Sequence, residues 1–240
     1  MISLVFPAYN EQDRISDSMV HTREYCDAHF TKYQVIVVDD GSLDGTTAML
    51  EKMAAVWPNL KVIHSLVNRG KGAATRDGVL AADGEWILCS DVDLSTPIEE
   101  SANMLAAGRN APVVIGSRAI KGAHIAKRQP WYRVVMGRVF NWVVRMVDVP
   151  GYLDTQCGFK LYRHDAGRAI FEKVTIKGFA FDVEVLFLAK KLGYPVVEVP
   201  VRWLNDERSK VHVFLDPLRM FLDVALVRWR QRGLPSGSNR

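Results

Sequence analysis

Short, continuously apolar segments alternate with longer segments of helical character through the first half of this 240-residue chain. A strand made only of apolar residues must be covered on both faces, which is typical of parallel sheets flanked by helices. The alternation therefore predicts an α/β domain with a predominantly parallel central sheet and right-handed crossovers. We expect strands at 2–6, 35–39, 60–64, 86–90 and 113–117, and helices at 13–28, 44–56, 71–82 and 98–107.

Polar residues stand at the end of every expected strand. The carboxyl ends of parallel strands meet at one edge of a sheet, and ligands of α/β sheets bind at that edge. We therefore expect a single site there. In chain order it would be built from Pro7, Ala8, Tyr9, Asn10 and Glu11, then Asp39, Asp40, Gly41 and Ser42, then Asn68, Arg69, Gly70, Lys71 and Gly72, then Asp91, Val92 and Asp93, and finally Arg118.

Two aspartates, Asp91 and Asp93, end the fourth expected strand with one residue between them. Two like charges this close raise each other's pKa, so a cation or good solvation should accompany them. Alternation along an extended segment places both carboxylates on one side and Val92 on the other. Mg²⁺ and Mn²⁺ bind carboxylate oxygens together with substrate phosphates, so the pair is a candidate metal site. The alternative is a solvated turn or helix cap, and the second acidic strand end at the same edge favours the metal site.

Several familiar nucleotide and hydrolase motifs are missing from the sequence. Residues 70–75 lack the third glycine of the dinucleotide fingerprint, and neither G-x-x-x-x-G-K-[ST] nor G-x-S-x-G occurs. These absences exclude P-loop NTPases and the nucleophile elbow of α/β-hydrolases, and they weaken a Rossmann dehydrogenase. For Asp40, Gly41 and Ser42 two interpretations stay open: a turn that opens a helix, or a carboxylate aimed at a base or ribose.

Two amphipathic helices are expected in the second half, at 131–147 and 217–232. The first carries Trp131 and Trp142 on an apolar half, with arginines on the other half. The second places Trp229 on an apolar stripe. Each helix either packs on the core or lies at a membrane interface, where Trp and Arg suit the headgroup region, and the pattern leaves both interpretations open.

The composition is that of a soluble globular protein, with a formal net charge of +4 at pH 7. This mild basic excess is compatible with a phosphate-bearing ligand or an anionic membrane surface, and we expect no nucleic-acid partner. Three cysteines without C-x-x-C spacing argue against a disulfide framework or zinc site and suit a reducing cytosol. Because no charged n-region with an apolar h-region and no apolar stretch of about 18 residues occurs, we expect neither a signal peptide nor a spanning helix.

Five motifs in order, V-F-P-A-Y-N-E, V-V-D-D-G-S-L-D-G-T, N-R-G-K-G-A-A, S-D-V-D-L-S-T-P and I-G-S-R, resemble the nucleotide half of the inverting glycosyltransferase family 2. In the distal half, D-T-Q-C-G-F-K-L-Y, G-F-A-F-D-V-E-V-L and V-P-V-R-W followed by S-K-V resemble the dolichyl-phosphate β-glucosyltransferases of that family. The related mannose synthases usually differ at D-T-Q-C-G-F-K. The resemblance covers about residues 2–213 and implies a GT-A (Rossmann-like) nucleotide-diphospho-sugar transferase fold.

The resemblance implies that UDP-glucose binds at the sheet edge. The residues implied to contact it are Pro7, Ala8, Tyr9, Glu11, Asp39, Asp40, Lys71, Asp91, Val92, Arg202, Arg208 and Lys210. The first six of these would hold the uridine, and the last three would close over the diphosphate from a mobile loop. Asp91 and Asp93 would bind a Mg²⁺ or Mn²⁺ ion that bridges the diphosphate. The residues implied in catalysis are Asp93, Arg118, Asp154, Gln156, Lys160 and Asp182, with Glu184 behind Asp182.

The implied reaction is metal-dependent, inverting transfer of glucose from UDP-glucose to a dolichyl or polyprenyl phosphate. Phosphate is already ionised near neutral pH, so its attack on the sugar C1 does not demand a strong base. The metal would neutralise the leaving diphosphate, and Arg and Lys would hold the two phosphate-bearing molecules. Alternatives are a GDP-mannose donor, a hydroxyl acceptor with Asp154 or Asp182 as base, and a non-catalytic sugar-nucleotide-binding module.

The expected organisation is one catalytic domain at 1–213, with a nucleotide-binding half at 1–118 and an acceptor-binding half at 119–213. An amphipathic helix at 214–232, for which the membrane-interfacial interpretation is open, and a disordered tail at 233–240 would follow. Family members are commonly tethered by a transmembrane helix. In its place we expect peripheral docking at the cytoplasmic face of a membrane through 131–147 and 214–232.

Overall fold

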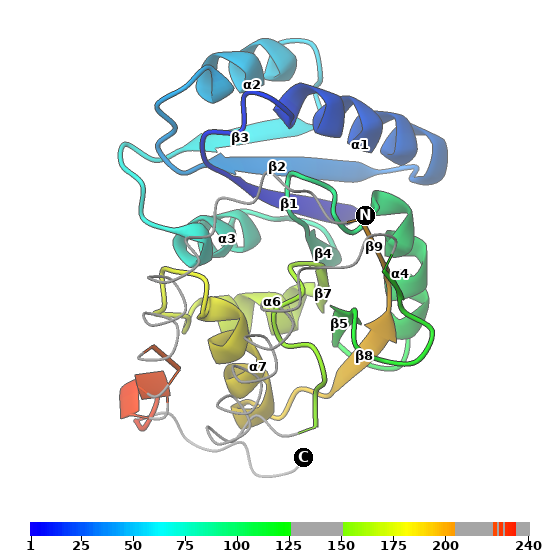
Figure 1. Ribbon diagram of the computed structural model, residues 1–240, viewed down its shortest axis with the longest axis vertical. Coiled ribbons are helices and arrows are strands. Elements are labelled where there is room, and N and C mark those ends of the chain that lie inside the picture. Colours follow the sequence, from blue (N-terminus) through cyan, green and yellow to red (C-terminus); the bar gives the residue numbers. More distant parts are fainter. Residues whose placement is uncertain (126–150, 205–222, 225, 228, 234–240) are drawn as a thin grey trace.

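A seven-stranded sheet forms the centre of the described part of the chain (Figure 1). The computed structural model describes residues 1–125, 151–204, 223, 224, 226, 227 and 229–233. The strand order is β3-β2-β1-β4-β7-β5-β8. The strands are β1 (Ile2–Ala8), β2 (Tyr33–Asp39), β3 (Leu60–His64), β4 (Trp86–Cys89), β5 (Val113–Ser117), β7 (Lys160–Arg163) and β8 (Val196–Pro200).

Helices cover both faces of this sheet. On one face lie α1 (Ile15–His29), α2 (Thr46–Ala54) and α4 (Ser101–Gly108), which follows a short 3₁₀ turn, η1 (Ile98–Glu100). On the other face lie α3 (Lys71–Leu80), α6 (His164–Phe171) and α7 (Phe181–Lys191). A separate parallel pair joins β6 (His124–Ile125) to β9 (Arg202–Trp203).

The five predicted strands and four predicted helices are confirmed, and each end lies within two residues of its predicted position except the start of the fourth helix, where η1 occupies the first three predicted residues. The sheet is mostly parallel, as expected, but β7 runs antiparallel between β4 and β5. The fourth and fifth strands are therefore not neighbours. Sequence patterning missed β7 because it is only four residues long and begins with a charged residue, Lys160.

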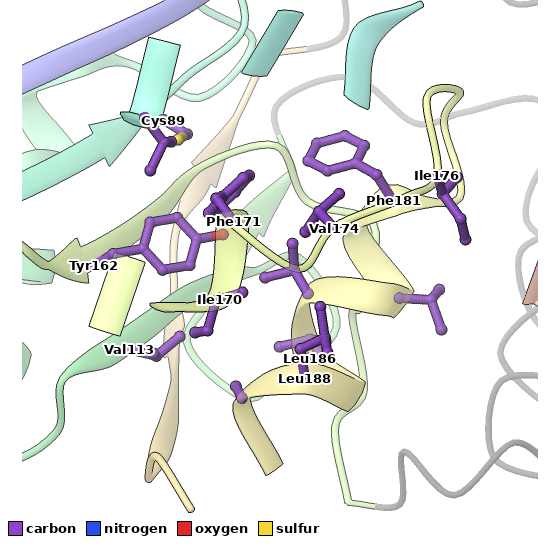
Figure 2. Close-up of a cluster of buried hydrophobic side chains, with 14 of the residues drawn as sticks. Cys89, Val113, Tyr162, Ile170, Phe171, Val174, Ile176, Phe181, Leu186 and Leu188 are labelled. Atoms are coloured by element: carbon purple, nitrogen blue, oxygen red, sulfur yellow. The ribbon is translucent and has the colours of Figure 1, made fainter. Parts of the chain in front are cut away.

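The strands of the sheet bury side chains on both faces, as their continuous apolar sequences predict. Along β1, Val5 packs on the side of α3, α6 and α7, whereas Leu4 and Phe6 pack on the side of α1, α2 and α4. Figure 2 shows the first of these clusters, in which Tyr162 meets the edge of Phe171 at a ring-centroid distance of 5.3 Å. The two clusters fix the strand ends at which the candidate site is built.

Of the two predicted amphipathic helices, only the second lies partly within the described residues. Residues 131–147 lie outside the described residues. In the described part of the second helix, Val224 and Val227 are buried, whereas Leu226 and Trp229 are exposed. Within the described parts of the chain, no helix combines the length and the apolar character needed to cross a membrane.

Candidate active site

The ends of β1 and β2 lie side by side, as predicted for the first part of the site. Ala8 pairs in register with Asp39, and the Asp40 amide donates to the Ala8 carbonyl at 2.8 Å. Pro7, within β1, lines a small pocket at this edge. Three residues beyond the strand, the Glu11 amide donates to Thr46 Oγ1 at 2.7 Å. The parallel register therefore brings together segments more than 30 residues apart in sequence.

The two aspartates that end β2 are buried and bind neutral donors. Asp39 accepts hydrogen bonds from the Ser42 amide at 3.1 Å and from Thr47 Oγ1 at 2.5 Å. Burial alone would raise the pKa of Asp39, but these hydrogen bonds outweigh it and hold the pKa below its usual value. Asp40 accepts from the amides of Arg69 and Gly70, at 3.0 and 2.7 Å. Asp40 thus anchors the loop that leads into α3.

Asp91 is joined by a cation, which is one of the two alternatives that the charge argument left open. Lys71, the first residue of α3, places its Nζ 2.5 Å from Asp91 Oδ1. Burial would raise the pKa of Asp91, but the Lys71 ammonium outweighs burial and lowers it. The same ion pair raises the pKa of Lys71 against the opposing effect of burial. Asp91 is therefore ionised and already neutralised by a residue of the protein.

Asp93 has a different environment from Asp91. Its Oδ1 accepts from the Ser95 amide at 2.8 Å, and its Oδ2 lies 4.0 Å from Arg14 Nη1. Burial, and secondarily the charge of Asp91, raise the pKa of Asp93. The side chain of Val92 between them is buried in the core, on the other side from the two carboxylates as expected, and its contact with a nucleotide sugar stays a prediction. Because that side chain faces the core, only the Val92 backbone can line a ligand site.

The donors at this strand end fit a hard divalent cation. Asp91 and Asp93 offer carboxylate oxygens, the ligands that Mg²⁺ and Mn²⁺ prefer. Gly158 leaves room beside Asp91, because a Cβ at Gly158 would lie 2.5 Å from Asp91 Oδ2. Within the described residues, no group of three or more His, Cys, Asp or Glu side chains is placed to bind a metal. The two carboxylates would therefore need oxygens from substrate or water to complete a coordination shell.

Arg118 and Asp154 form a bidentate pair at the end of β5. Arg118 Nε and Nη2 donate to the two Asp154 oxygens at 2.6 and 2.8 Å, and the Arg118 amide adds a third bond at 3.0 Å. The guanidinium also lies 5.4 Å from the ring centroid of Trp203. Burial would raise the pKa of Asp154, but Arg118 outweighs it and lowers that pKa.

Gln156 follows this pair and has a donor to spare. The Gln156 backbone amide donates to Asp154 Oδ1 at 3.2 Å. Its Nε2 atom is buried and has no hydrogen-bond partner among the described residues. A buried donor without a partner is costly, so this atom is a candidate contact for an oxygen-rich ligand.

Lys160 and Asp182 form a second ion pair, almost completely buried. Lys160 donates to Asp182 Oδ1 and to the Cys157 carbonyl. Burial raises the pKa of Asp182, although Lys160 opposes the shift. The small pocket separates this pair from Lys71 and Asp91. Its apolar side is formed by Cys89, Tyr162 and Phe181, which Figure 2 labels.

The remaining predicted residues differ in outcome. Tyr9 directly follows β1, and Glu11 pairs with Arg14 in the next turn. Arg202 was expected in a mobile loop, but it lies in β9, paired with β6, and its Nε donates to Glu100. Strand pairing and the Glu100 carboxylate therefore place Arg202 in β9 and not in a loop, whereas its contact with the diphosphate stays a prediction. Arg208 and Lys210 lie outside the described residues.

Three residues of the site were missed by sequence reasoning. Arg14 approaches Asp93, and its position three residues after Glu11 is a helical pairing signal. Glu198 accepts from the amides of Leu153 and Asp154, which steadies the loop before Gln156. A glycine such as Gly158 can signal a close approach between two segments, but a single sequence does not identify Asp91 as the neighbouring group.

Comparison with known proteins places this arrangement in a family. Residues 3–171 match the family described as Glycosyl transferase family 2. A dolichyl-phosphate beta-glucosyltransferase from Homo sapiens is 36% identical over 95% of this chain and 75% of the relative. One from Dictyostelium discoideum is 31% identical over 95% of this chain and 74% of the relative.

Solved structures show the same fold at lower identity. Mannosyl-3-phosphoglycerate synthase from Rubrobacter xylanophilus superposes with a TM-score of 0.71 at 19% identity, covering 100% of this chain and 77% of that chain. Glucosyl-3-phosphoglycerate synthase from Mycobacterium tuberculosis, in complex with Mn²⁺, UDP and glucosyl-3-phosphoglycerate, has a TM-score of 0.66 at 19% identity, covering 99% and 81%. The chain therefore has the GT-A fold and belongs to glycosyl transferase family 2.

Proposed function

We propose that the chain transfers glucose from UDP-glucose to a dolichyl or polyprenyl phosphate, with inversion at C1 and with Mg²⁺ or Mn²⁺ bound. The observation that carries this proposal is the Asp91 and Asp93 pair at the sheet edge, with Lys71 on Asp91. The names of relatives that align with most of this chain support the lipid-phosphate acceptor and the glucosyl product. Neighbouring structures that contain Mn²⁺ and UDP-glucose support the donor and the metal.

Residues at the site divide the work of binding. Asp91 and Asp93 would hold the metal, which supplies Lewis-acid neutralisation of the leaving diphosphate. Lys71 stands beside them as a protein cation for the same phosphates. The ends of β1 and β2, from Pro7 to Glu11 and at Asp39 and Asp40, would line the uridine. Gln156 would offer its unpartnered Nε2 to the sugar or to the acceptor phosphate.

The two carboxylates considered as bases for a hydroxyl acceptor are both bound by cations. Asp154 accepts two bonds from the Arg118 side chain, and Asp182 accepts from Lys160. Arg118 lowers the pKa of Asp154, which makes it a poor proton acceptor. The pKa of Asp182 is raised, but its Oδ1 is occupied by the bond from Lys160. An ionised phosphate needs no base, so the geometry favours a phosphate acceptor over a hydroxyl.

Peripheral membrane contact is the second part of the proposal, because the acceptor carries a lipid chain. In the described C-terminal part of the chain, Leu226 and Trp229 are exposed, and the Arg232 guanidinium lies 5.0 Å from the Trp229 ring centroid. Exposed Trp beside Arg suits a headgroup region. We propose that this surface contacts the cytoplasmic face of a membrane. The segment at 131–147 remains a predicted contact.

A donor and acceptor screen tests the reaction. UDP-glucose, UDP-galactose, GDP-mannose and GDP-glucose are each offered with polyprenyl phosphate and Mn²⁺ or Mg²⁺, and the anomer of the product is assigned by NMR. We expect β-glucosyl lipid phosphate from UDP-glucose only. Preference for GDP-mannose would move the chain to the mannose synthases. Nucleotide binding without transfer to any acceptor would indicate a binding module.

Vesicle sedimentation tests the membrane surface. Trp229→Ser should lower the bound fraction on vesicles with anionic lipid, because an interfacial Trp is lost. Leu66→Ser is the matched control, since Leu66 is fully exposed in the loop after β3. Equal binding by the two variants would count against contact through Trp229.

A further inference from the structure

Glu184 lies at the centre of a buried hydrogen-bond cluster that the roles above do not use. It stands in α7 with 0% exposure. Its Oε2 accepts from the amides of Thr175 and Ile176 at 2.9 and 2.8 Å. Its Oε1 accepts from Thr175 Oγ1 at 2.8 Å and from Gln231 Nε2 at 2.6 Å. Burying a carboxylate is costly, and the four donors offset that cost here. No ion pair of Glu184 occurs among the described residues.

The segment bound by Glu184 also binds the start of α3. The Lys177 carbonyl accepts from the amides of Gly72 and Ala73 at 2.7 and 3.2 Å. The first amides of a helix have no partner within the helix, so this carbonyl satisfies two of them. The strap 175–177, as we call this segment, therefore joins Glu184 to the first turn of α3.

Two glycines allow this close contact. A Cβ at Gly70 would lie 2.5 Å from the Lys177 carbonyl oxygen, and one at Gly72 would lie 2.4 Å from the Ile176 carbonyl oxygen. Gly70 also has a φ of +101°, which side-chain-bearing residues rarely adopt. The sequence around Lys71 is thus shaped to receive the strap. Lys71 itself lies between these glycines and reaches Asp91.

We propose that Glu184 is a positioning residue that, through the strap 175–177, sets the start of α3 and hence the Lys71 ammonium against Asp91. Glu184 touches no reacting group. Gln231 supports it from the C-terminal part of the chain, where its Nε2 also donates to the Lys173 carbonyl at 3.0 Å. The expected effect on UDP binding rests on the proposed function. The effect on α3 does not.

Hydrogen exchange on the full-length protein without ligand tests the link. Glu184→Met removes every acceptor at similar length, and Glu184→Gln keeps one acceptor oxygen. We expect the Gly72 and Ala73 amides to exchange about tenfold faster in Glu184→Met, with a smaller effect in Glu184→Gln. Gln231→Met should give the smallest increase. If Glu184→Met does not fold, Glu184→Gln and Gln231→Met decide the question. Unchanged exchange in both overturns the proposal.

A matched control separates local positioning from general destabilisation. Ser3 is buried near the start of β1, where its hydroxyl donates to Gln34 Oε1 and accepts from the Gly84 amide. Ser3→Ala should lower the melting temperature without changing exchange at Gly72 and Ala73. Equal acceleration in Ser3→Ala and Glu184→Gln would mean that Glu184 is merely structural, and would overturn the proposal.

Calorimetric titration with UDP and Mn²⁺ tests the reach of the link into the site. We expect Glu184→Met to bind UDP about tenfold more weakly than wild type, the scale on which outer-shell partners tune a site. Wild-type UDP affinity in a variant with accelerated exchange would overturn the positioning of Lys71. Absence of UDP binding by the wild-type protein would instead defeat the proposed function. The exchange measurement would still decide the role of Glu184.

Discussion

The carboxylates at the end of β2 and those around the pocket are held by different partners, although all of them except the partly exposed Asp91 are buried. Among the described residues, Asp39 and Asp40 accept hydrogen bonds from backbone amides, hydroxyls and an imidazole nitrogen, and the Arg69 Nε atom lies 3.9 Å from Asp40 Oδ1 without donating to it. Asp91, Asp154 and Asp182 each pair with a Lys or Arg. In the first arrangement, the neutral donors around Asp39 and Asp40 belong to loops, so these two carboxylates fix the conformation of those loops. The second keeps charges in a buried region, where they are neutralised until a charged ligand arrives.

The largest expected effect is a loss of activity on substitution of Asp93. This carboxylate combines the two arrangements, because it binds the neutral Ser95 amide and also lies near the Arg14 guanidinium. Asp93→Ala should lower transfer at least about a thousandfold, because a site with one remaining carboxylate loses its metal. The fold should stay intact, since among the described residues Asp93 binds the Ser95 amide and otherwise lies 4.0 Å from Arg14 Nη1. Transfer and thermal unfolding are measured together, with EDTA-treated wild type as reference. Full activity in EDTA would remove the metal from the mechanism.

The buried pair should show the largest effect on stability. Lys160→Met leaves the Asp182 carboxylate without its cation and should lower the free energy of unfolding by about 3–5 kcal/mol. The double variant Lys160→Met with Asp182→Leu should recover most of that loss. Arg163→Met is the matched control, because Arg163 pairs with Asp165 at an exposed site, where a loss under about 1 kcal/mol is expected. Similar losses in the free energy of unfolding for Lys160→Met and Arg163→Met, measured by urea titration, would contradict the contrast between the buried and the exposed ion pair.

A carboxylate held by neutral donors should give a smaller effect. Asp40→Ala leaves the Arg69 and Gly70 amides without an acceptor, and a loss of about 1–3 kcal/mol is expected. Asp83→Ala serves as control, since Asp83 lies at an exposed turn and accepts a single 3.3 Å bond from Gln34. Urea denaturation measures both. A loss for Asp40→Ala no larger than the control's would deny that Asp40 anchors the loop before α3.

The smallest expected effect appears in the pH dependence. The pKa of Asp39 is lowered in the folded state, so the unfolded state takes up the proton first as pH falls. The contribution of Asp39 to stability is thus complete above its ordinary value of 3.8 and is lost as pH falls through the lower, folded value. Asp39→Asn should flatten the stability curve below about pH 5. Asp93→Asn should act in the opposite sense, because the pKa of Asp93 is raised. Curves of equal slope for the two variants would contradict these assignments.

The sequence predicted the edge of the sheet well and the interior of the site poorly. Apolar continuity is a local signal, so the five strands and the meeting of their polar ends followed from it. The need for either a cation or good solvation at Asp91 also followed, but not that Lys71 supplies a cation. Partners such as Glu198 with Asp154 come from distant segments, and no periodicity links them. Arg202 was misplaced for the same reason, because its partner Glu100 is 102 residues away.

The antiparallel strand β7 has a consequence for how the chain can be divided. β7 supplies the only described connection between β4 and β5, which do not pair with each other. A fragment that ended at residue 118 would leave both strands with open edges, a template for aggregation. Synthesis must therefore pass residue 163 before the sheet can close. Residues 1–118 therefore cannot serve as a separate module, since among the described residues β4 and β5 are joined only by β7, which follows them in sequence.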